Sequence, residues 1–377
     1  MHISNFKAGK WVQRYRYKSF EPNVVDVAWQ IDNPELAMLL SRADIKLGEL
    51  NAYSQLIPDV DFFIKMHIMK EGTQSSRIEG TQTNIDEAVQ KEEYIDPEKK
   101  DDWQEVQNYV SAMNRAIANL EKLPLSNRLL RQTHEILLQG VRGKHKLPGE
   151  FRNSQNWIGG SSLSDAVFIP PHPDGVADLM ADLERFLHNQ NTPVPHLVKI
   201  GIAHYQFETI HPFLDGNGRI GRLLITLFLV DNQLLHKPTL YLSDFFEKHK
   251  MLYYDNLTRV RTHNDLTQWL KFFLEGVYRT SENSIETFKR IIRLRSEVEH
   301  QIIGLGKKQA LAKLFLQYLY GKPITDAADV AQALEVNITT ALRLIDDFMK
   351  LGILTELTGY KRNRIFSFDK YLKLFRE

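Results

Sequence analysis

Residues 210–222 read IHPFLDGNGRIGR, and they lie between two apolar helical patterns, His196–Thr209 and Leu223–Val230. The Asp-Gly-Asn-Gly tetrapeptide at 215–218 contains residue types that tolerate positive φ angles, so backbone N–H groups can point into one concavity. A helix that begins near Gly218 adds the partial positive charge of its N-terminus. The pattern therefore predicts a phosphate-binding turn between two core helices.

Two arginines extend this turn into the following helix. Arg219 and Arg222 are three residues apart, so they lie on one face of its first turn. Their guanidinium forks are suited to binding successive phosphates in bidentate fashion. The spacing predicts a polyphosphate ligand.

A base and a metal ligand precede the helix. His211 is the residue type whose unperturbed pKa lies near neutrality, which suits it to taking a proton from an attacking hydroxyl. Asp215 offers the hard oxygen that Mg²⁺ prefers. Each residue alone is typical of a capping turn with a core histidine and solvated arginines. Their combination within one short stretch favours a catalytic site.

The stretch matches the signature HPFxDGNGRxxR of the Fic family at every fixed position, so the chain resembles that family. The resemblance implies a mainly α-helical fold, with a helical core and a small β-hairpin flap, and transfer of AMP from ATP to a protein hydroxyl. It implies that His211 is the base and that Asp215 holds Mg²⁺. The nucleotide-binding set that it implies is Gly216, Asn217, Gly218, Arg219, Ile220, Gly221 and Arg222, with Arg219 on the β-phosphate and Arg222 on the γ-phosphate.

Further segments resemble other parts of the family. The motifs GEFR (149–152), NWIGG (156–160) and FIPP (168–171) are similar to its flap, which pairs with an extended target segment by strand addition. Tyr253 and Tyr254 resemble the aromatic pair near the adenine, with Tyr253 preferred. Ordinary helix packing is the alternative for both tyrosines.

An upstream motif bears on regulation. Ser75 to Gly80 reads SSRIEG and fits the family's inhibitory pattern [ST]xxxE[GN]. Its alternative is a helix that ends at a glycine C-cap. We expect Glu79 to pair with Arg222 and so to compete with the γ-phosphate of ATP, and we expect Ser75, which begins the motif, to be the second regulatory residue.

The C-terminal region has a different pattern. Gln309–Tyr320, Asp326–Leu334 and Asn337–Leu351 are helical, whereas 353–357 and 364–368 alternate like strands, which predicts a winged helix-turn-helix. Residues 307–377 carry 12 lysines and arginines against 8 acidic residues, with basic residues gathered at 361–364. DNA binding and a protein-contact or dimerisation role both remain open.

Composition limits the remaining possibilities. The 377-residue chain has a formal net charge of +1 and no cysteine, so thiolate catalysis and disulfides are excluded. It has neither a secretory signal nor a long apolar run, so we expect a cytoplasmic protein with no membrane contact. We expect four regions: an N-terminal helical region with the inhibitory helix (1–95), the catalytic core (96–280), a linker helix (281–306) and the winged helix (307–377).

The leading hypothesis is a Mg²⁺-dependent protein adenylyltransferase that modifies a serine, threonine or tyrosine of a target protein or of itself. Removal of AMP by the same site is one alternative. A transcriptional regulator whose core senses nucleotide is the other. We expect a homodimer.

Overall fold

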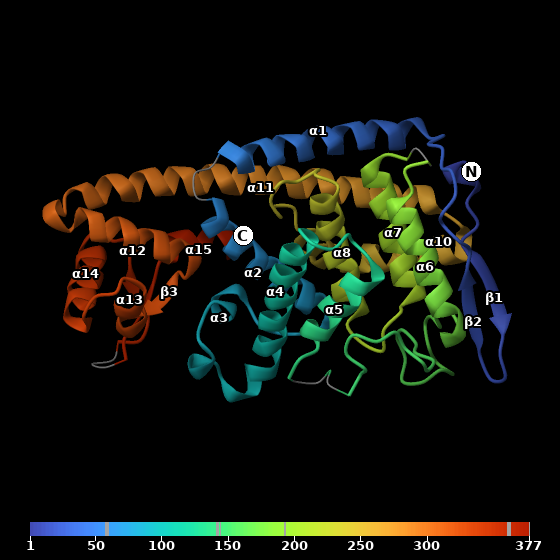
Figure 1. Cartoon of the computed structure of the whole chain (residues 1–377), viewed down its shortest axis with the longest axis horizontal. Helices are drawn as coiled ribbons and strands as arrows, with labels where there is room; N and C mark the ends of the chain where they lie inside the picture. Colours follow the sequence, from blue (N-terminus) through green and yellow to red (C-terminus); the bar gives the residue numbers. More distant parts are fainter. Residues whose placement is uncertain (57–59, 141–142, 144, 192–193, 360–362, 377) are drawn as a thin grey trace.

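The computed structural model describes residues 1–56, 60–140, 143, 145–191, 194–359 and 363–376, and it is mainly α-helical, as the sequence predicted. Two long helices, α1 (Pro34–Leu56) and α11 (Leu266–Ile303), lie side by side along one edge of the molecule (Figure 1). Asp265 caps α11 by accepting a hydrogen bond from Gln268 N. None of the described helices is long and apolar enough to cross a bilayer.

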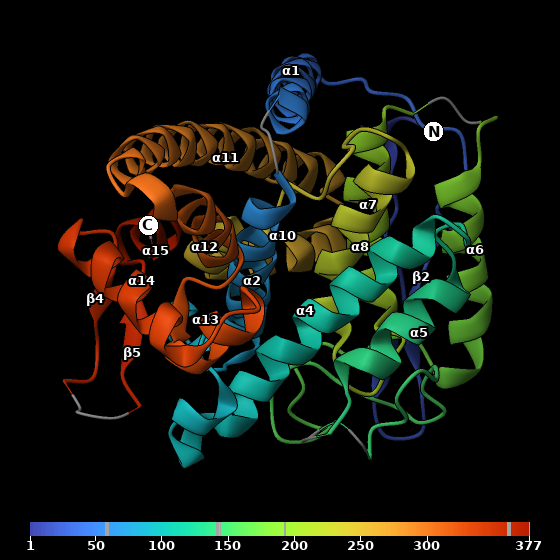
Figure 2. The ribbon, with the colours of Figure 1, turned by 60° about the vertical axis from the view of Figure 1, so that its left-hand side comes forward.

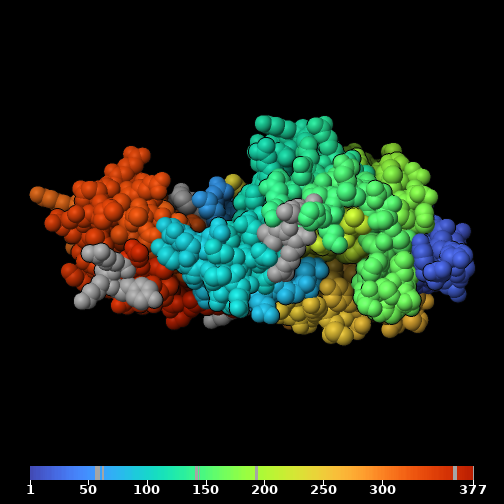
Figure 3. Space-filling view, turned by 90° about the horizontal axis from the view of Figure 1, so that it is seen from below, coloured from blue at the N-terminus to red at the C-terminus, as the bar shows by residue number. Residues whose placement is uncertain are grey.

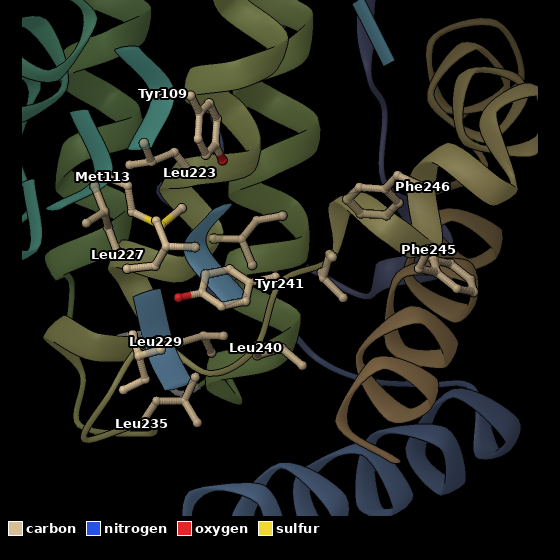
Figure 4. Close-up of a cluster of buried hydrophobic side chains, with 14 of the residues drawn as sticks. Tyr109, Met113, Leu223, Leu227, Leu229, Leu235, Leu240, Tyr241, Phe245 and Phe246 are labelled. Carbon is tan, nitrogen blue, oxygen red and sulfur yellow. The ribbon is translucent and has the colours of Figure 1, made fainter. Parts of the chain in front are cut away.

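The helices of the region predicted to be the catalytic core pack beneath this pair. They are α4 (Lys100–Leu120), α5 (Asn127–Leu137), α6 (Val176–His188), α7 (His196–Ile210), α8 (Asn217–Asp231), α9 (Ser243–Lys248) and α10 (Lys250–His263). In α7 every residue after His196 is buried, which is typical of a central helix enclosed by others. Leu223 and Leu227 of α8 pack with Tyr109 and Met113 of α4 (Figure 4).

The suspected inhibitory segment is the end of a long helix. Helix α2 (Val60–Glu79) runs through the molecule and contacts α4, α8 and α9. The residue after it, Gly80, has a φ of 112°, which reverses the chain. The glycine C-cap that was the alternative interpretation of the motif is therefore present. It coexists with Glu79 at the end of the helix, so the two interpretations do not exclude each other. The short helix α3 (Ile85–Ala88) follows, with Asn84 and Glu87 forming a capping box.

The N-terminus contains a hairpin that the sequence analysis did not predict. Strands β1 (Gly9–Gln13) and β2 (Lys18–Pro22) pair antiparallel, with Trp11 opposite Phe20. Phe20 N donates to Ile169 O across 2.9 Å, so β2 supports the base of the predicted flap.

The flap itself is less regular than expected. Its two arms meet in a single antiparallel bridge, Ile158 with Phe168, and the segment between them is turns. Gly159 and Gly160 both have positive φ, and a Cβ on Gly160 would lie 2.5 Å from Asp165 O, so these two glycines permit the tight turn.

The C-terminal unit contains the three predicted helices, α12 (Gln309–Gly321), α13 (Ala327–Ala333) and α14 (Ile338–Lys350). Its sheet has the order β3-β5-β4, formed by Ile324–Asp326, Ile365–Ser367 and Thr355–Glu356. The two predicted strands are present but shorter, and β3 and the final helix α15 (Asp369–Arg376) were not predicted. Lys361 and Arg362 of the predicted basic turn lie outside the described residues, and the winged-helix assignment stays a prediction.

Short 3-10 helices complete the element order: η1 (Ile3–Asn5), η2 (Glu92–Tyr94), η3 (Pro97–Lys99), η4 (Pro173–Gly175) and η5 (Gly306–Lys308). Two of them, η2 and η3, lie directly before α4, on either side of the expected boundary at residues 95 and 96. Helix α11 continues without a break across residues 280 and 281, so the expected start of the linker at 281 falls inside a helix.

The C-terminal unit packs against α2 and the segment that follows it, a contact visible in two further views (Figure 2, Figure 3). Lys91 Nζ lies 2.6 Å from Asp326 Oδ2 and 2.8 Å from Asp329 Oδ1. Arg376 pairs with Asp86 at 2.8 Å. Phe63 of α2 also contacts the rings of Tyr320 and Tyr371.

Candidate active site

The site lies at the junction of α7 and α8, where two residues adopt left-handed conformations. His211 has φ 51° directly after α7 ends at Ile210, and Gly216 has φ 76° directly before α8 begins at Asn217. The Asn217 side chain closes the loop, because Oδ1 accepts from Phe213 N and Nδ2 donates to Phe213 O, both across 2.8 Å. The first N–H groups of α8 have no acceptor within the helix and face this loop.

A buried arginine holds the backbone of His211. Arg152 Nε donates to His211 O across 2.9 Å, and Nη2 donates to Pro171 O across 2.6 Å and to Ile210 O across 3.3 Å. Its own N–H donates to Pro212 O across 2.9 Å. Arg152 is 2% exposed. Arg152 thus joins the base of the flap to the end of α7. It fixes the position of the His211 backbone, from which the imidazole extends.

The imidazole of His211 is in its neutral form. Burial, together with the charges of Arg261 and Arg152, lowers the pKa of His211 to about 3, although Glu79 and the Glu208 carbonyl oppose the shift. Its Nδ1 is buried and has no hydrogen-bond partner among the described residues. A neutral imidazole can accept a proton, which is what a general base requires.

A second histidine supports the loop from α5. The ring of His134 stacks on Phe213 with 3.8 Å between centroids, and its Nε2 lies 2.9 Å from Asp215 O. Its Nδ1 accepts from Gly149 N across 2.9 Å. A Cβ on Gly216 would lie 3.5 Å from this ring and 3.3 Å from Leu137, so the loop passes close to α5.

Asp215 is positioned for a metal ion by its exposure. Its side chain is 43% exposed, and Oδ1 accepts from Gly216 N across 2.6 Å and lies 3.6 Å from Arg219 Nη2. Neither contact uses Oδ2. The described residues contain no cluster of three or more metal-ligating side chains, so a metal bound here needs phosphate oxygens and water as further ligands. This donor set fits Mg²⁺, which commonly takes one or two carboxylates together with such oxygens.

Both motif arginines are engaged by carboxylates. Arg219 is 5% exposed, and its Nη1 donates to Glu105 Oε2 of α4 across 3.1 Å. Arg222 is 2% exposed, and its Nη2 donates to Glu79 Oε1 across 2.6 Å. The predicted contact between Glu79 and Arg222 is therefore present.

Ser75 completes the contact with α2. Arg222 Nε donates to Ser75 Oγ and Nη2 donates to Ser75 O, both across 2.9 Å. Burial tends to raise the pKa of Glu79, but the charge and hydrogen bond of Arg222 outweigh it, and the net effect is a lowered pKa. Glu79 is ionised in this contact.

Gly218 provides the space that this contact occupies. A Cβ at Gly218 would lie 2.3 Å from Glu79 Oε1 and 3.0 Å from Arg222 Nη1. Any side chain here would collide with the ion pair. The absence of a side chain at Gly218, the second glycine of the motif turn, therefore leaves room for the Glu79 carboxylate.

Two members of the predicted nucleotide-binding set face the core. Ile220 is fully buried, and its N–H donates to Gly216 O across 3.0 Å inside the helix. A Cβ on Gly221 would lie 2.2 Å from Glu208 Oε1, and its carbonyl lies 2.8 Å from His204 Nδ1. Both residues thus pack against the core, and their predicted contact with nucleotide stays a prediction.

The two tyrosines of the pair differ in exposure, and the predicted contact of Tyr253 with the adenine stays a prediction. Tyr253 is 1% exposed, and its hydroxyl lies 2.8 Å from His204 Nε2 while its ring stacks on Phe246. Tyr254 is 38% exposed. Of the two rings, Tyr254 is the one that a ligand can reach without rearrangement, because Tyr253 is enclosed by helices.

Sequence reasoning missed several residues that organise the site: Glu105, His134, His204, Glu208 and Arg261. Arg261 Nη2 donates to Glu208 O and Nε donates to Thr209 Oγ1, both across 3.2 Å, while its guanidinium lies 4.0 Å from the centre of the Phe168 ring. No local motif marks these residues. The sequence signal that could have identified them is a charged or polar residue inside an otherwise apolar helical pattern.

Comparisons with known proteins agree with the motif. Residues 37–118 match the model of the Fic/DOC family N-terminal domain, and residues 124–229 match that of the Fic/DOC family. A "Protein adenylyltransferase Fic" of Aedes aegypti is 34% identical over 133 residues, and that of Drosophila melanogaster is 42% identical over 83 residues. The matches cover 35% and 22% of this chain, but only 24% and 15% of those proteins.

Solved structures share the fold. A Fic family protein from Desulfovibrio desulfuricans G20 superposes with a TM-score of 0.55 at 22% identity, over 90% of this chain and 97% of that one. Fic-1 from C. elegans superposes with a TM-score of 0.52 at 19% identity, over 70% of this chain and 75% of that one. The overlap with the first structure extends over nearly the whole chain.

Proposed function

Because this chain belongs to the Fic/DOC family, we propose that it is a protein adenylyltransferase that transfers AMP from ATP to a hydroxyl side chain. The observation that supports this most is the single loop that joins a neutral His211, a half-exposed Asp215 and the start of α8 with Arg219 and Arg222. A base, a metal-ligand oxygen and a phosphate-binding helix start lie within one turn of chain.

The proposed chemistry uses these groups in order. The N–H groups at the start of α8 bind the phosphates, and Arg219 and Arg222 hold their negative charge. Asp215 would hold Mg²⁺, which neutralises phosphate charge when bound. His211 accepts the proton of a serine, threonine or tyrosine hydroxyl, whose oxygen attacks the α-phosphorus as the bond to pyrophosphate breaks.

The target is a protein segment that lies along the flap. The flap is connected to His211, because Asn156 Nδ2 donates to His211 O across 3.2 Å and Arg152 donates to both His211 O and Pro171 O. An extended target backbone that adds to the flap presents its side chains toward the imidazole. The target is another protein or a second copy of this chain, and the homodimer stays part of the proposal.

Glu79 acts as a brake in this proposal. Arg222 already donates to Glu79 and Ser75, so a γ-phosphate has to displace an internal carboxylate. A charge-assisted hydrogen bond contributes about 1.5 to 3 kcal/mol. At about 1.4 kcal/mol per factor of ten, Glu79 would lower productive ATP binding on the order of tenfold to a hundredfold.

Removal of AMP is a second candidate, because the Glu79 carboxylate lies close enough to Arg222 and His211 for both to influence its pKa. A carboxylate in that place can orient a water molecule toward a modified hydroxyl. Release of AMP from a modified target by the wild type, with none by Glu79→Ala, would support this activity.

The experiment that tests the main proposal compares two labelled forms of ATP. The protein is incubated with Mg²⁺ and ATP labelled at the α-phosphate or at the γ-phosphate, and incorporation into protein is measured. Adenylyl transfer leaves the α-label on protein and the γ-label in pyrophosphate. Incorporation of the γ-label would mean phosphoryl transfer and would refute the proposal.

A further inference from the structure

The N-terminal hairpin forms one surface with the flap. Strands β1 and β2 project from the end of the molecule opposite the C-terminal unit (Figure 1). Phe20 N of β2 donates to Ile169 O at the base of the flap across 2.9 Å. The ring of Trp11 in β1 packs against that of Phe168, with 5.9 Å between their centroids. The hairpin therefore extends the surface of the flap.

A short chain of hydrogen bonds connects the hairpin to the proposed base. Tyr17 OH donates to Gln155 Oε1 across 3.3 Å, and Gln155 Nε2 donates to Asn156 O across 3.0 Å. Asn156 Nδ2 in turn donates to His211 O across 3.2 Å. The tip of the hairpin and the backbone of His211 are thus linked through two flap residues, so a segment bound along the flap can contact both regions.

Exposed apolar side chains gather on the hairpin and the flap. Trp11 is 45% exposed and Trp157 is 40% exposed, whereas the other three tryptophans of the chain are not exposed. Val167 is 73% exposed and Tyr15, in the hairpin loop, is 89% exposed. Exposed apolar groups that gather in one region, with polar groups around them, mark surfaces for contacts with other proteins. These side chains indicate a surface that a protein partner covers.

Two cations on this surface have no acidic partner. Arg16 in the hairpin loop and Lys18 at the start of β2 are exposed, and neither pairs with a carboxylate among the described residues. Glu21, the one acidic residue of the hairpin, pairs with Arg14. Because side chains alternate along a strand, Lys18 lies on the same face of β2 as Phe20, whose ring contacts the flap. The flap side of the hairpin thus carries unpaired positive charge beside exposed rings.

We propose that the flap side of the hairpin, with Trp11, Tyr15, Arg16 and Lys18, docks an acidic segment of the protein substrate. Glutamate or aspartate side chains complement the two unpaired cations, and charge complementarity of this kind selects among partners. The chain that continues from the docked segment along the flap brings its hydroxyl to His211. This proposal rests on the proposed function and deepens it, because it names the class of substrate: a protein with carboxylates beside the modified serine, threonine or tyrosine.

A protein partner fits this surface better than a nucleic acid does. Single-stranded nucleic acids bind in positively charged grooves that follow the backbone over about 4 to 16 nucleotides. The hairpin offers two unpaired cations, and the Trp11 ring packs against Phe20 and Phe168 instead of standing free for stacking. Cations so few and so close to the flap therefore favour a short acidic peptide.

Binding of labelled peptides to the full chain tests the docking without an enzyme assay. One short peptide has a serine, a threonine and a tyrosine at its centre and glutamates on both sides, and a matched peptide has glutamine at each glutamate position. In fluorescence anisotropy at low salt, the glutamate peptide should bind more tightly, and added sodium chloride should remove the difference. The double variant Arg16→Gln, Lys18→Gln should weaken binding of the glutamate peptide about 2- to 30-fold, as expected for two exposed charge pairs.

A matched double variant separates a site from general charge. Lys7→Gln, Lys10→Gln removes two exposed cations at the same end of the molecule, and Lys10 lies on the face of β1 opposite to Trp11. This variant should bind the glutamate peptide as the wild type does. The reversal Arg16→Glu, Lys18→Glu should instead prefer a peptide with lysines at the glutamate positions, a gain that a misfolded hairpin could not show.

Four results would overturn the docking proposal. Equal affinity of the wild type for the glutamate and glutamine peptides would show that charge is not selected. Equal losses in the two glutamine double variants would show that net charge acts and not a site. Tighter binding of labelled oligothymidylate, lost in Arg16→Gln, Lys18→Gln, would assign the surface to nucleic acid. A dimer in sedimentation experiments that this variant alone dissociates would assign it to a second copy of the chain.

An activity measurement tests whether docking selects substrates. In the Glu79→Gly background, the α-label of ATP should enter the glutamate peptide with a lower KM than the glutamine peptide and with a similar kcat. Adding Arg16→Gln and Lys18→Gln should remove this difference in KM and leave the KM for ATP unchanged. Equal KM values, or label that enters the protein but neither peptide, would overturn the selecting role. Absence of label from the protein and from both peptides would refute the proposed function, while the anisotropy result would stand.

Discussion

Arg222 of α8 donates a hydrogen bond to Glu79 of α2 across 2.6 Å, although the two residues are 143 positions apart in sequence. The guanidinium is buried, and Ser75 accepts two further hydrogen bonds from it. Helix α2 thus satisfies a buried charge that would otherwise be costly. In the proposed function the same contact occupies the guanidinium that would hold the γ-phosphate, so one contact would account for both stability and inhibition.

The role of His211 leads to a first prediction. His211→Ala should lower transfer of the α-label by about 10² to 10⁴-fold, since general-base catalysis contributes about that much. The variant is best measured together with Glu79→Gly, which should raise the signal. ATP binding should stay within a few fold, because the phosphate contacts come from α8. His263→Ala removes an exposed histidine at the end of α10 and is the control; activity retained in His211→Ala would exclude it as the base.

The pH dependence follows from the neutral imidazole. Burial lowers the pKa of His211 to about 3, and the base is active when deprotonated. The rate should therefore show no loss attributable to His211 as pH falls from 8 to about 5. A histidine with the ordinary pKa of about 6.5 would lose half of its activity near that pH. Such a midpoint in kcat/KM would contradict the burial argument.

Buried Glu208 gives a prediction for stability. Burial raises its pKa from 4.5 to about 7, so the folded state holds its proton more tightly than the unfolded state. The stability from this group is complete below pH 4.5 and is lost as pH rises through about 7. Glu208→Gln should have similar stability at pH 5 and should exceed the wild type by up to about 3 kcal/mol at pH 8.

Urea unfolding at the two pH values measures this difference. Glu286→Gln changes an exposed glutamate of α11 and should give no pH-dependent difference. A constant effect of Glu208→Gln at pH 5 and pH 8 would show that Glu208 is ionised in the folded protein throughout this range.

Arg152 supplies a prediction about positioning. Arg152→Lys keeps a charge but loses the fork that donates to the His211, Ile210 and Pro171 carbonyls. The free energy of unfolding should fall by at least about 2 kcal/mol, since buried acceptors lose their donors. Among folded molecules kcat should fall more than KM for ATP, because the imidazole moves while the phosphate contacts remain.

Arg185→Lys provides the matched control, since the Arg185 side chain is 61% exposed. Unchanged unfolding and unchanged kcat for Arg152→Lys would contradict the positioning role.

The helical core was predictable because its pattern is local. Helices α4 to α7 follow the apolar periodicity of their segments, and the loop at 215–218 follows from residue types that permit positive φ. The pairing of Glu79 with Arg222 was predictable because the inhibitory motif at 75–80 lies upstream of the signature motif at 211–222. These features depend on short stretches of sequence.

The remaining features depend on tertiary contacts. The β1–β2 hairpin has no glycine or proline in its turn, and β2 is held by Ile169 of a distant segment. Tyr253 is buried because His204 and Phe246 enclose it, and the spacing of the tyrosine pair does not reveal which ring faces outward. Glu105 contacts Arg219 from another helix, so no local pattern marks it.

The central claim is that Glu79 restrains an adenylyltransferase site by holding Arg222. The most direct test is mass spectrometry of the purified protein after incubation with Mg²⁺ and ATP, comparing the wild type with Glu79→Gly. Arg77→Gly places a glycine at the same end of α2 but keeps the carboxylate, so it controls for a weakened helix. We predict that AMP-modified protein rises about tenfold to a hundredfold in Glu79→Gly and stays at the wild-type level in Arg77→Gly. Equal modification of wild type and Glu79→Gly would contradict the claim.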